Sequence, residues 1–97
     1  MADRPPLDLL IKNVRVVRPG QEAVEPRDVG VLDGRFARVE PVIDAALARE
    51  VFDARGQLGF PGVVDAHTHV GIYAPLPDDA VTESQAAVSG GVTTVLT

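Results

Sequence analysis

The chain has 97 residues, of which 45% are hydrophobic and 24% are charged, and its formal net charge at pH 7 is −5. This length allows one small domain or a piece of a larger one, and the hydrophobic content argues against intrinsic disorder. Because the net charge is negative and the arginines are scattered along the chain, the composition also argues against a nucleic-acid partner.

The first residues are polar, and no apolar run long enough for a signal peptide or a membrane span follows them. The chain has no cysteine, which removes disulfides and thiolate ligands and is compatible with a reducing compartment. We therefore expect a cytoplasmic protein with no membrane partner.

Residues 1–60 are predicted to form a small β-rich domain. Apolar and β-branched runs predict strands at residues 9–17, 28–32, 36–39 and 50–53. Asp33-Gly34-Arg35 separates two of these runs and is a strong signal for a β-hairpin. Residues 43–49 fit either a loop or one helical turn, and we expect a loop.

Two histidines, the only ones in the chain, follow the next apolar run. Val63 and Val64 predict a short buried strand that carries His67 and His69 at its end. Residues two apart on a strand share a face, so both imidazoles can point at one metal ion, and neutral imidazole is a common zinc ligand. A catalytic zinc needs at least three protein ligands, so the others would come from elsewhere. The alternative is a pair of polar histidines at a strand end, hydrogen-bonded to backbone or water.

A helix is predicted after the histidines. Pro75 and Pro77 mark a loop, and the carboxylates of Asp78 and Asp79 are placed to cap the helix start. Helix formers then occupy residues 80–89.

A second strand follows that helix. Gly90-Gly91 can supply the left-handed conformation that ends a helix, and β-branched content predicts a strand over residues 92–97. Strand, helix and strand make a βαβ unit, the building block of the eight-stranded barrel, whose functional sites lie at the carboxyl ends of its strands. His67 and His69 lie at such an end, which favours a functional pair.

Two motifs in this region form a recognisable combination. The first reads PGVVDAHTH at residues 61–69, and the second reads TESQAAVSGGVTT at residues 82–94. Together they resemble the amidohydrolase superfamily, specifically its cyclic amidohydrolase branch of dihydropyrimidinases, hydantoinases, allantoinases and dihydroorotases. The resemblance covers essentially the whole chain. It implies an α/β fold in which a small, sandwich-like β-domain (residues 1–60) leads into the first β-α-β of a (β/α)8 metallo-hydrolase barrel (residues 61–97), incomplete in this chain.

The resemblance also implies a chemistry. A binuclear metal centre, usually zinc, carries a bridging hydroxide that attacks the carbonyl of a ring amide and opens the ring. His67 and His69 correspond to the first two metal ligands. Asp65 matches the family's Asp-x-His-x-His pattern, and we expect it to support the pair without binding the metal. The alternative for Asp65 is a carboxylate that makes only local hydrogen bonds.

Two positions bear on the substrate. Dihydroorotases typically carry an arginine two residues after the second histidine, where this chain has Gly71, so dihydroorotate is a poor candidate. Tyr73 is a candidate contact for a small cyclic amide, although a tyrosine in a loop more often packs against the protein.

In the resembled family the remaining ligands and the general base come from later barrel strands, which this chain does not include. We therefore expect the segment to require the remaining barrel, as a continuation or as a partner chain, for activity, and to form a homo-oligomer when complete. Two other readings stay open: a non-catalytic assembly module that resembles these enzymes, and an inert fragment.

Overall fold

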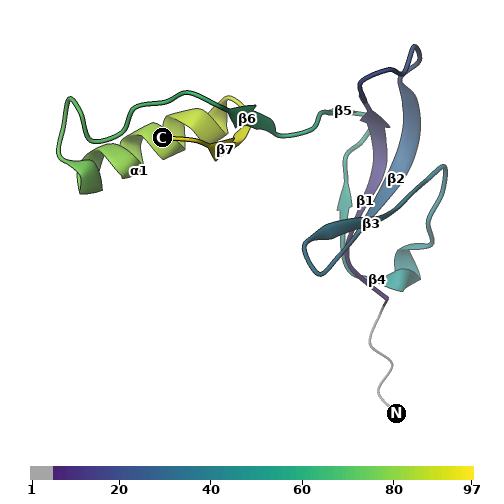
Figure 1. Cartoon of the computed structure of the whole chain (residues 1–97). Coiled ribbons are helices and arrows are strands. Elements are labelled where there is room, and N and C mark those ends of the chain that lie inside the picture. The colour runs from purple at the N-terminus through teal and green to yellow at the C-terminus, as the bar shows by residue number, and fades with distance from the viewer. Residues whose placement is uncertain (1–5) are drawn as a thin grey trace. The chain divides into compact units, whose positions relative to one another are not determined.

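The computed structural model describes residues 6–97 and divides into two compact units (Figure 1). The first unit ends at Phe60, and the second spans Pro61–Thr97. Within residues 6–97, no helix has the length and apolar character needed to cross a bilayer.

The first unit is a single β-sheet with one short 3-10 helix. Its elements are β1 (Leu7–Val16), β2 (Glu25–Leu32), β3 (Arg35–Glu40), η1 (Ala45–Leu47), β4 (Ala48–Asp53) and β5 (Leu58–Gly59). The strand order is β3-β2-β1-β4, and β5 also pairs with β1. All four strands predicted from the sequence in this unit are confirmed, with ends that differ by a few residues.

The expected sandwich-like arrangement is not found among residues 6–60, which form one sheet. β1 is antiparallel to β2 on one side, and on the other side it runs parallel first to β4 and then to β5. β3 pairs with the other edge of β2, so all five strands belong to one sheet and none is left to build a facing sheet.

The predicted hairpin is confirmed between β2 and β3. Leu32 pairs with Arg35, so Asp33 and Gly34 form a two-residue turn, with φ angles of 51° and 74°. Both residues have positive φ, as the turn that matches the twist of a hairpin requires.

The prediction of a loop over residues 43–49 is wrong. Ala45–Leu47 form η1, and β4 begins at Ala48. The Asp44 carboxylate accepts the N–H of Ala46 at 2.9 Å and closes the turn, while Ile43 is 1% exposed and anchors it.

The core of the first unit consists of two small apolar clusters. They are formed by Leu7, Leu10 and Ile43, and by Val14, Val29 and Ala54. A fully buried aliphatic side chain contributes roughly 1.5–3 kcal/mol. Because this core is small, polar interactions account for an important share of the stability.

A bulge interrupts the pairing of β1 with β2. One extra residue of β1 lies between Ile11 and Val14, and Asn13 there has a φ of 57°. Asparagine tolerates this left-handed conformation better than most residues. The bulge turns the N–H of Asn13 away from the strand ladder, so this donor needs another acceptor.

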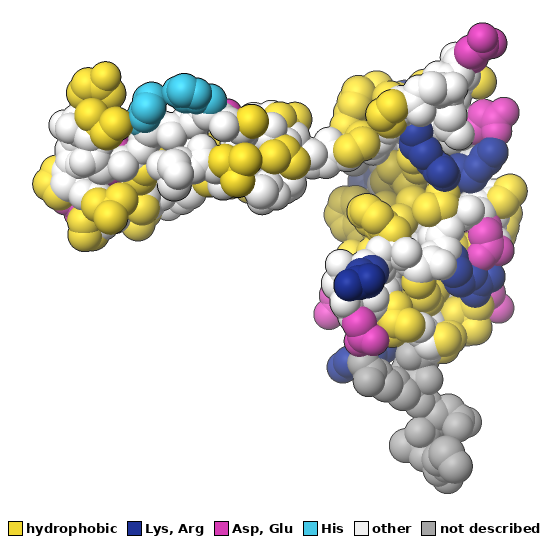
Figure 2. Space-filling view, in the orientation of Figure 1, with side chains coloured by type: hydrophobic (Ala, Val, Ile, Leu, Met, Phe, Trp, Pro, Cys, Tyr) yellow, Lys and Arg dark blue, Asp and Glu magenta, His cyan; other side chains and the backbone are white. Residues whose placement is uncertain are grey.

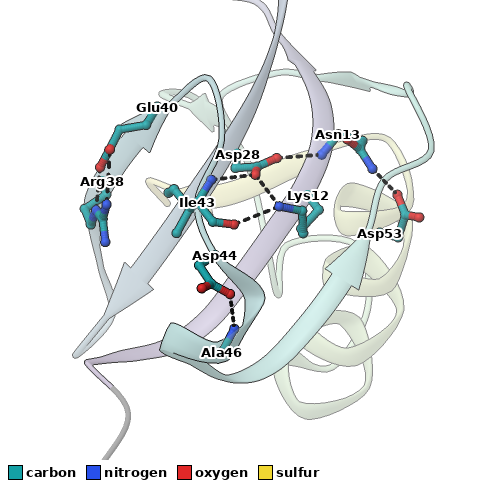
Figure 3. A network of polar contacts seen from close by, with 9 residues as sticks. All are labelled: Lys12, Asn13, Asp28, Arg38, Glu40, Ile43, Asp44, Ala46 and Asp53. Atoms are coloured by element: carbon teal, nitrogen blue, oxygen red, sulfur yellow. Dashed lines mark hydrogen bonds and ion pairs between the residues drawn. The ribbon is translucent and has the colours of Figure 1, made fainter.

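Asp28 supplies that acceptor (Figure 3). Its carboxylate, on a residue only 3% exposed, accepts the N–H of Asn13 at 3.0 Å, the N–H of Ile43 at 2.8 Å and the ammonium of Lys12 at 2.6 Å. Burial alone raises the pKa of Asp28, but the hydrogen bonds from these three partners outweigh it, and the pKa lies below its ordinary value. One buried charge therefore joins β1, β2 and the segment before η1.

The second unit is the predicted strand, helix and strand. It contains β6 (Val63–Asp65), α1 (Leu76–Ser89) and β7 (Val92–Val95). β6 and β7 are parallel, and the N–H of Leu96 donates to the carbonyl of Asp65 at 2.9 Å to extend the pairing. This βαβ connection is confirmed.

The start of α1 differs from the prediction, whereas its end agrees with it. The helix begins at Leu76, so Pro77 lies in its first turn and not in a loop. Proline is tolerated there because the first N–H groups of a helix have no partner within the helix. At the other end the left-handed residue is Gly91, with φ 94°, whereas Gly90 has φ −93°.

Candidate metal centre

Both histidines lie beyond the strand that was predicted to carry them. β6 ends at Asp65, and His67 and His69 occupy the irregular segment that follows. The prediction of shared strand geometry is therefore wrong. The β-branched pair that defines the strand is Val63-Val64, and the pairing with β7 ends soon after it.

Backbone hydrogen bonds nevertheless fix this segment. The N–H of His67 donates to the Asp65 carboxylate at 3.1 Å, and the N–H of Thr68 donates to the carbonyl of Leu96 at 3.2 Å. The second bond ties the residue between the two histidines to the chain that leaves β7. The segment is thus held close to the carboxyl ends of both strands.

The two imidazoles converge. Their Nε2 atoms are 3.2 Å apart, the ring centroids are 4.9 Å apart, and the ring planes meet at 84°. Both residues are exposed, and Figure 2 shows the pair side by side on the surface of the second unit. The predicted convergence is present, although loop geometry produces it.

The donor set fits a tetrahedral metal ion. Two nitrogens that each lie about 2.0–2.1 Å from one zinc ion are ~3.3–3.4 Å apart, close to the distance between these Nε2 atoms. The same distance suits a hydrogen bond between two neutral imidazoles, which one zinc ion would replace. Among residues 6–97 no group of three or more His, Cys, Asp or Glu side chains is arranged to hold a metal ion.

The side chains of Asp65 and Tyr73, the other candidates from the sequence, do not join the pair of histidine rings. Asp65 acts on the backbone of His67, so its observed contact is the local hydrogen bond. Tyr73 is 91% exposed in the bend before α1. In the part of the chain that the structure describes, neither side chain forms a hydrogen bond with an imidazole ring.

Asp79 was predicted from the sequence to cap the start of the helix, and the structure gives it a different contact. It lies in the first turn of α1, where its charge favours the helix dipole, but no side chain caps the helix start at Pro75. Its carboxylate instead accepts the N–H of Gly71 at 2.7 Å. The signal in the sequence was only an acidic residue near a helix start, which does not reveal a partner eight residues away.

Comparison with known proteins gives a consistent result. No family model matches the chain. A dihydroorotase of Pediococcus pentosaceus is 39% identical over 92 residues, which cover 94% of this chain and 21% of the relative. A D-hydantoinase of Rhizobium radiobacter is 33% identical over 93 residues, which cover 93% of this chain and 20% of the relative.

Solved structures agree with these relatives. An L-hydantoinase (dihydropyrimidinase) from Arthrobacter aurescens matches with a TM-score of 0.74 and 30% identity, over 92% of this chain and 20% of that one. An N-acyl-D-glutamate deacylase from Bordetella bronchiseptica, solved with zinc and a phosphonate inhibitor, matches with a TM-score of 0.73 and 29% identity, over 92% of this chain and 18% of that one. This chain spans about a fifth of the length of these relatives. The chain is therefore homologous, over nearly all of its own length, to a segment of cyclic amidohydrolases, and its structural neighbours come from the amidohydrolase superfamily.

Proposed function

We propose that this chain contributes His67 and His69 as two ligands of a divalent-metal centre in an enzyme that hydrolyses a ring amide. The observation that carries the proposal is the 3.2 Å separation of the two Nε2 atoms, which matches two ligands on one tetrahedral ion. The homology to dihydroorotases and hydantoinases supplies the reaction class.

Zinc is the proposed metal, in a binuclear centre when the site is complete. Neutral imidazole suits zinc well, and a structural relative was solved with zinc. Another structural relative, a D-aminoacylase, has a binuclear metal center. A bound zinc ion polarises a carbonyl oxygen and lowers the pKa of a water molecule toward neutrality.

The residues of this chain would position that chemistry. His67 and His69 present neutral nitrogen donors, which requires both rings to be deprotonated at Nε2. Asp65 holds the backbone of His67 and thereby supports its ring without being a ligand. Tyr73, exposed in the bend before α1, is our candidate for a contact to the substrate ring.

The rest of the site would come from a further segment, either a continuation or a partner chain that completes a (β/α)8 barrel. The described residues supply two imidazoles and no third ligand beside them. Four apolar residues on or next to the paired strands of the second unit are exposed, as expected of surfaces that further barrel elements would cover: Val63, Val64, Val95 and Leu96. We further propose that the complete enzyme is a homo-oligomer.

Gly71 narrows the substrate class. An arginine at this position would hold a substrate carboxylate, and glycine has no side chain to do so. We therefore propose an uncharged ring, such as a hydantoin or a dihydropyrimidine, in preference to dihydroorotate.

Zinc titration of the purified protein tests the assignment. With a chromophoric chelator as competitor, we expect the wild type to take up zinc and both His67→Ala and His69→Ala to lose most of that affinity. Ile72→Ala removes an exposed apolar side chain from the neighbouring bend and serves as the matched control, with affinity unchanged. Wild-type zinc affinity in either histidine variant would refute the assignment.

Activity needs the complete particle, so native mass spectrometry should first establish which other polypeptide and how many zinc ions accompany the chain. Ring opening of a hydantoin and of a dihydropyrimidine is then followed for that particle. Turnover at the wild-type rate after His67→Ala would exclude the proposed role.

A further inference from the structure

We infer that Asp79 is a positioning residue for His69, an inference that rests on the proposed function. The Asp79 carboxylate accepts the N–H of Gly71 at 2.7 Å, a distance typical of a strong hydrogen bond to a charged acceptor. Gly71 is only two residues after His69, so a carboxylate on α1 holds the chain on which the second imidazole depends.

The conformation of Gly71 makes this tether specific. Its φ is 83°, and a Cβ atom at this position would lie 3.0 Å from the Cδ1 atom of Leu76. Only glycine meets both conditions without strain. The chain therefore turns back onto the start of α1 at Gly71, and this turn directs its N–H to Asp79.

The Asp79 carboxylate is available to accept the N–H of Gly71 because the backbone N–H of Asp79 already has an acceptor within α1. Its N–H donates to the carbonyl of Pro75 at 2.9 Å, as the first hydrogen bond of α1. The carboxylate thus adds a contact that helix formation does not need. Together with the bonds at His67 and Thr68, it fixes both ends of the segment that carries the two imidazoles.

Asp78 offers a matched control on the same helical turn. It carries the same charge in the first turn of α1, so removing either carboxylate has a similar effect on the helix dipole. Of the two, only the Asp79 carboxylate accepts the N–H of Gly71. A difference between the Asp78→Ala and Asp79→Ala variants therefore measures the tether and not the dipole.

The test combines zinc affinity with amide exchange in the purified protein. We expect Asp79→Ala to lower zinc affinity about tenfold, within the range seen when groups that orient metal ligands are removed. We also expect it to abolish protection of the Gly71 amide and to shift the imidazole resonances of His69. Asp78→Ala should keep all three properties, and Asp79→Asn, which retains one acceptor oxygen, should recover most of the affinity.

Two results would overturn the inference. One is an Asp79→Ala variant whose zinc affinity equals that of Asp78→Ala. The other is an Asp79→Asn variant as impaired as Asp79→Ala, because the charge and not the hydrogen bond would then matter. If the wild type takes up no zinc, the proposed function fails. The spectra of the metal-free protein then test the positioning role of Asp79 by themselves, and unchanged His69 resonances in Asp79→Ala would overturn that role.

Discussion

Asp28→Asn is the most informative perturbation of the first unit, because it keeps the shape of a buried side chain and removes its charge. The carboxylate accepts from Lys12, Ile43 and Asn13. An asparagine side chain has one acceptor oxygen and one amide group, so at least one of these donors would face another donor.

The expected loss follows from these contacts. Removing one partner of a buried ion pair costs about 3–5 kcal/mol, and we expect the lower end because the Lys12 side chain is 23% exposed and can turn toward water. A loss of about 3 kcal/mol raises the population of the open state by roughly a hundredfold or more.

Acid should remove the difference in stability between the wild type and Asp28→Asn. The pKa of Asp28 is lowered in the folded protein, so its carboxylate stabilises the fold above the unfolded pKa of about 4 and ceases to do so as the pH falls through the folded pKa. The difference in unfolding free energy between wild type and variant should therefore be full at pH 7 and shrink progressively below about pH 4.

Amide exchange at Asn13 and Ile43, together with urea unfolding followed by circular dichroism, measures the effect. Glu40→Gln is the control, since it makes the same chemical change in the partly exposed ion pair with Arg38 and should cost much less stability than Asp28→Asn. Wild-type protection of the Ile43 amide in Asp28→Asn, or a difference that persists unchanged at low pH, would refute the reasoning.

Two further changes probe the second unit. Gly62→Ala should weaken the pairing of β6 with β7, because a Cβ atom at Gly62 would overlap the side chain of Thr93; faster exchange of the Val63 amide checks this, and wild-type exchange would contradict it. Tyr73→Ala in the complete particle should raise KM for the ring substrate and leave the urea midpoint unchanged, since the side chain is 91% exposed; an unchanged KM would remove Tyr73 from the substrate site.

Local signals predicted most of the secondary structure. The Asp33-Gly34 turn was predictable because its residues favour the positive φ angles that the hairpin requires. The strands were predictable from their β-branched content. η1 was missed because its stability depends on the burial of Ile43, which contacts residues far away in the sequence.

The site was only partly predictable for the same reason. The spacing of His67 and His69 indicated that their rings could converge, but the convergence depends on a loop whose anchors are Leu96 and Asp79. The buried pair of Asp28 with Lys12 was not predicted either. No local pattern distinguishes a carboxylate that serves a bulge on a neighbouring strand from one exposed to solvent.

The anchored segment after β6 lowers the entropic cost of binding a metal ion. Backbone N–H groups at His67, Thr68 and Gly71 already have acceptors. Ordering one residue costs roughly 1–2 kcal/mol of conformational entropy, and here the loop is ordered when the unit folds, before any ion arrives. Changes at the anchoring positions can therefore tune how tightly the same two imidazoles bind, with no change in the ligands themselves.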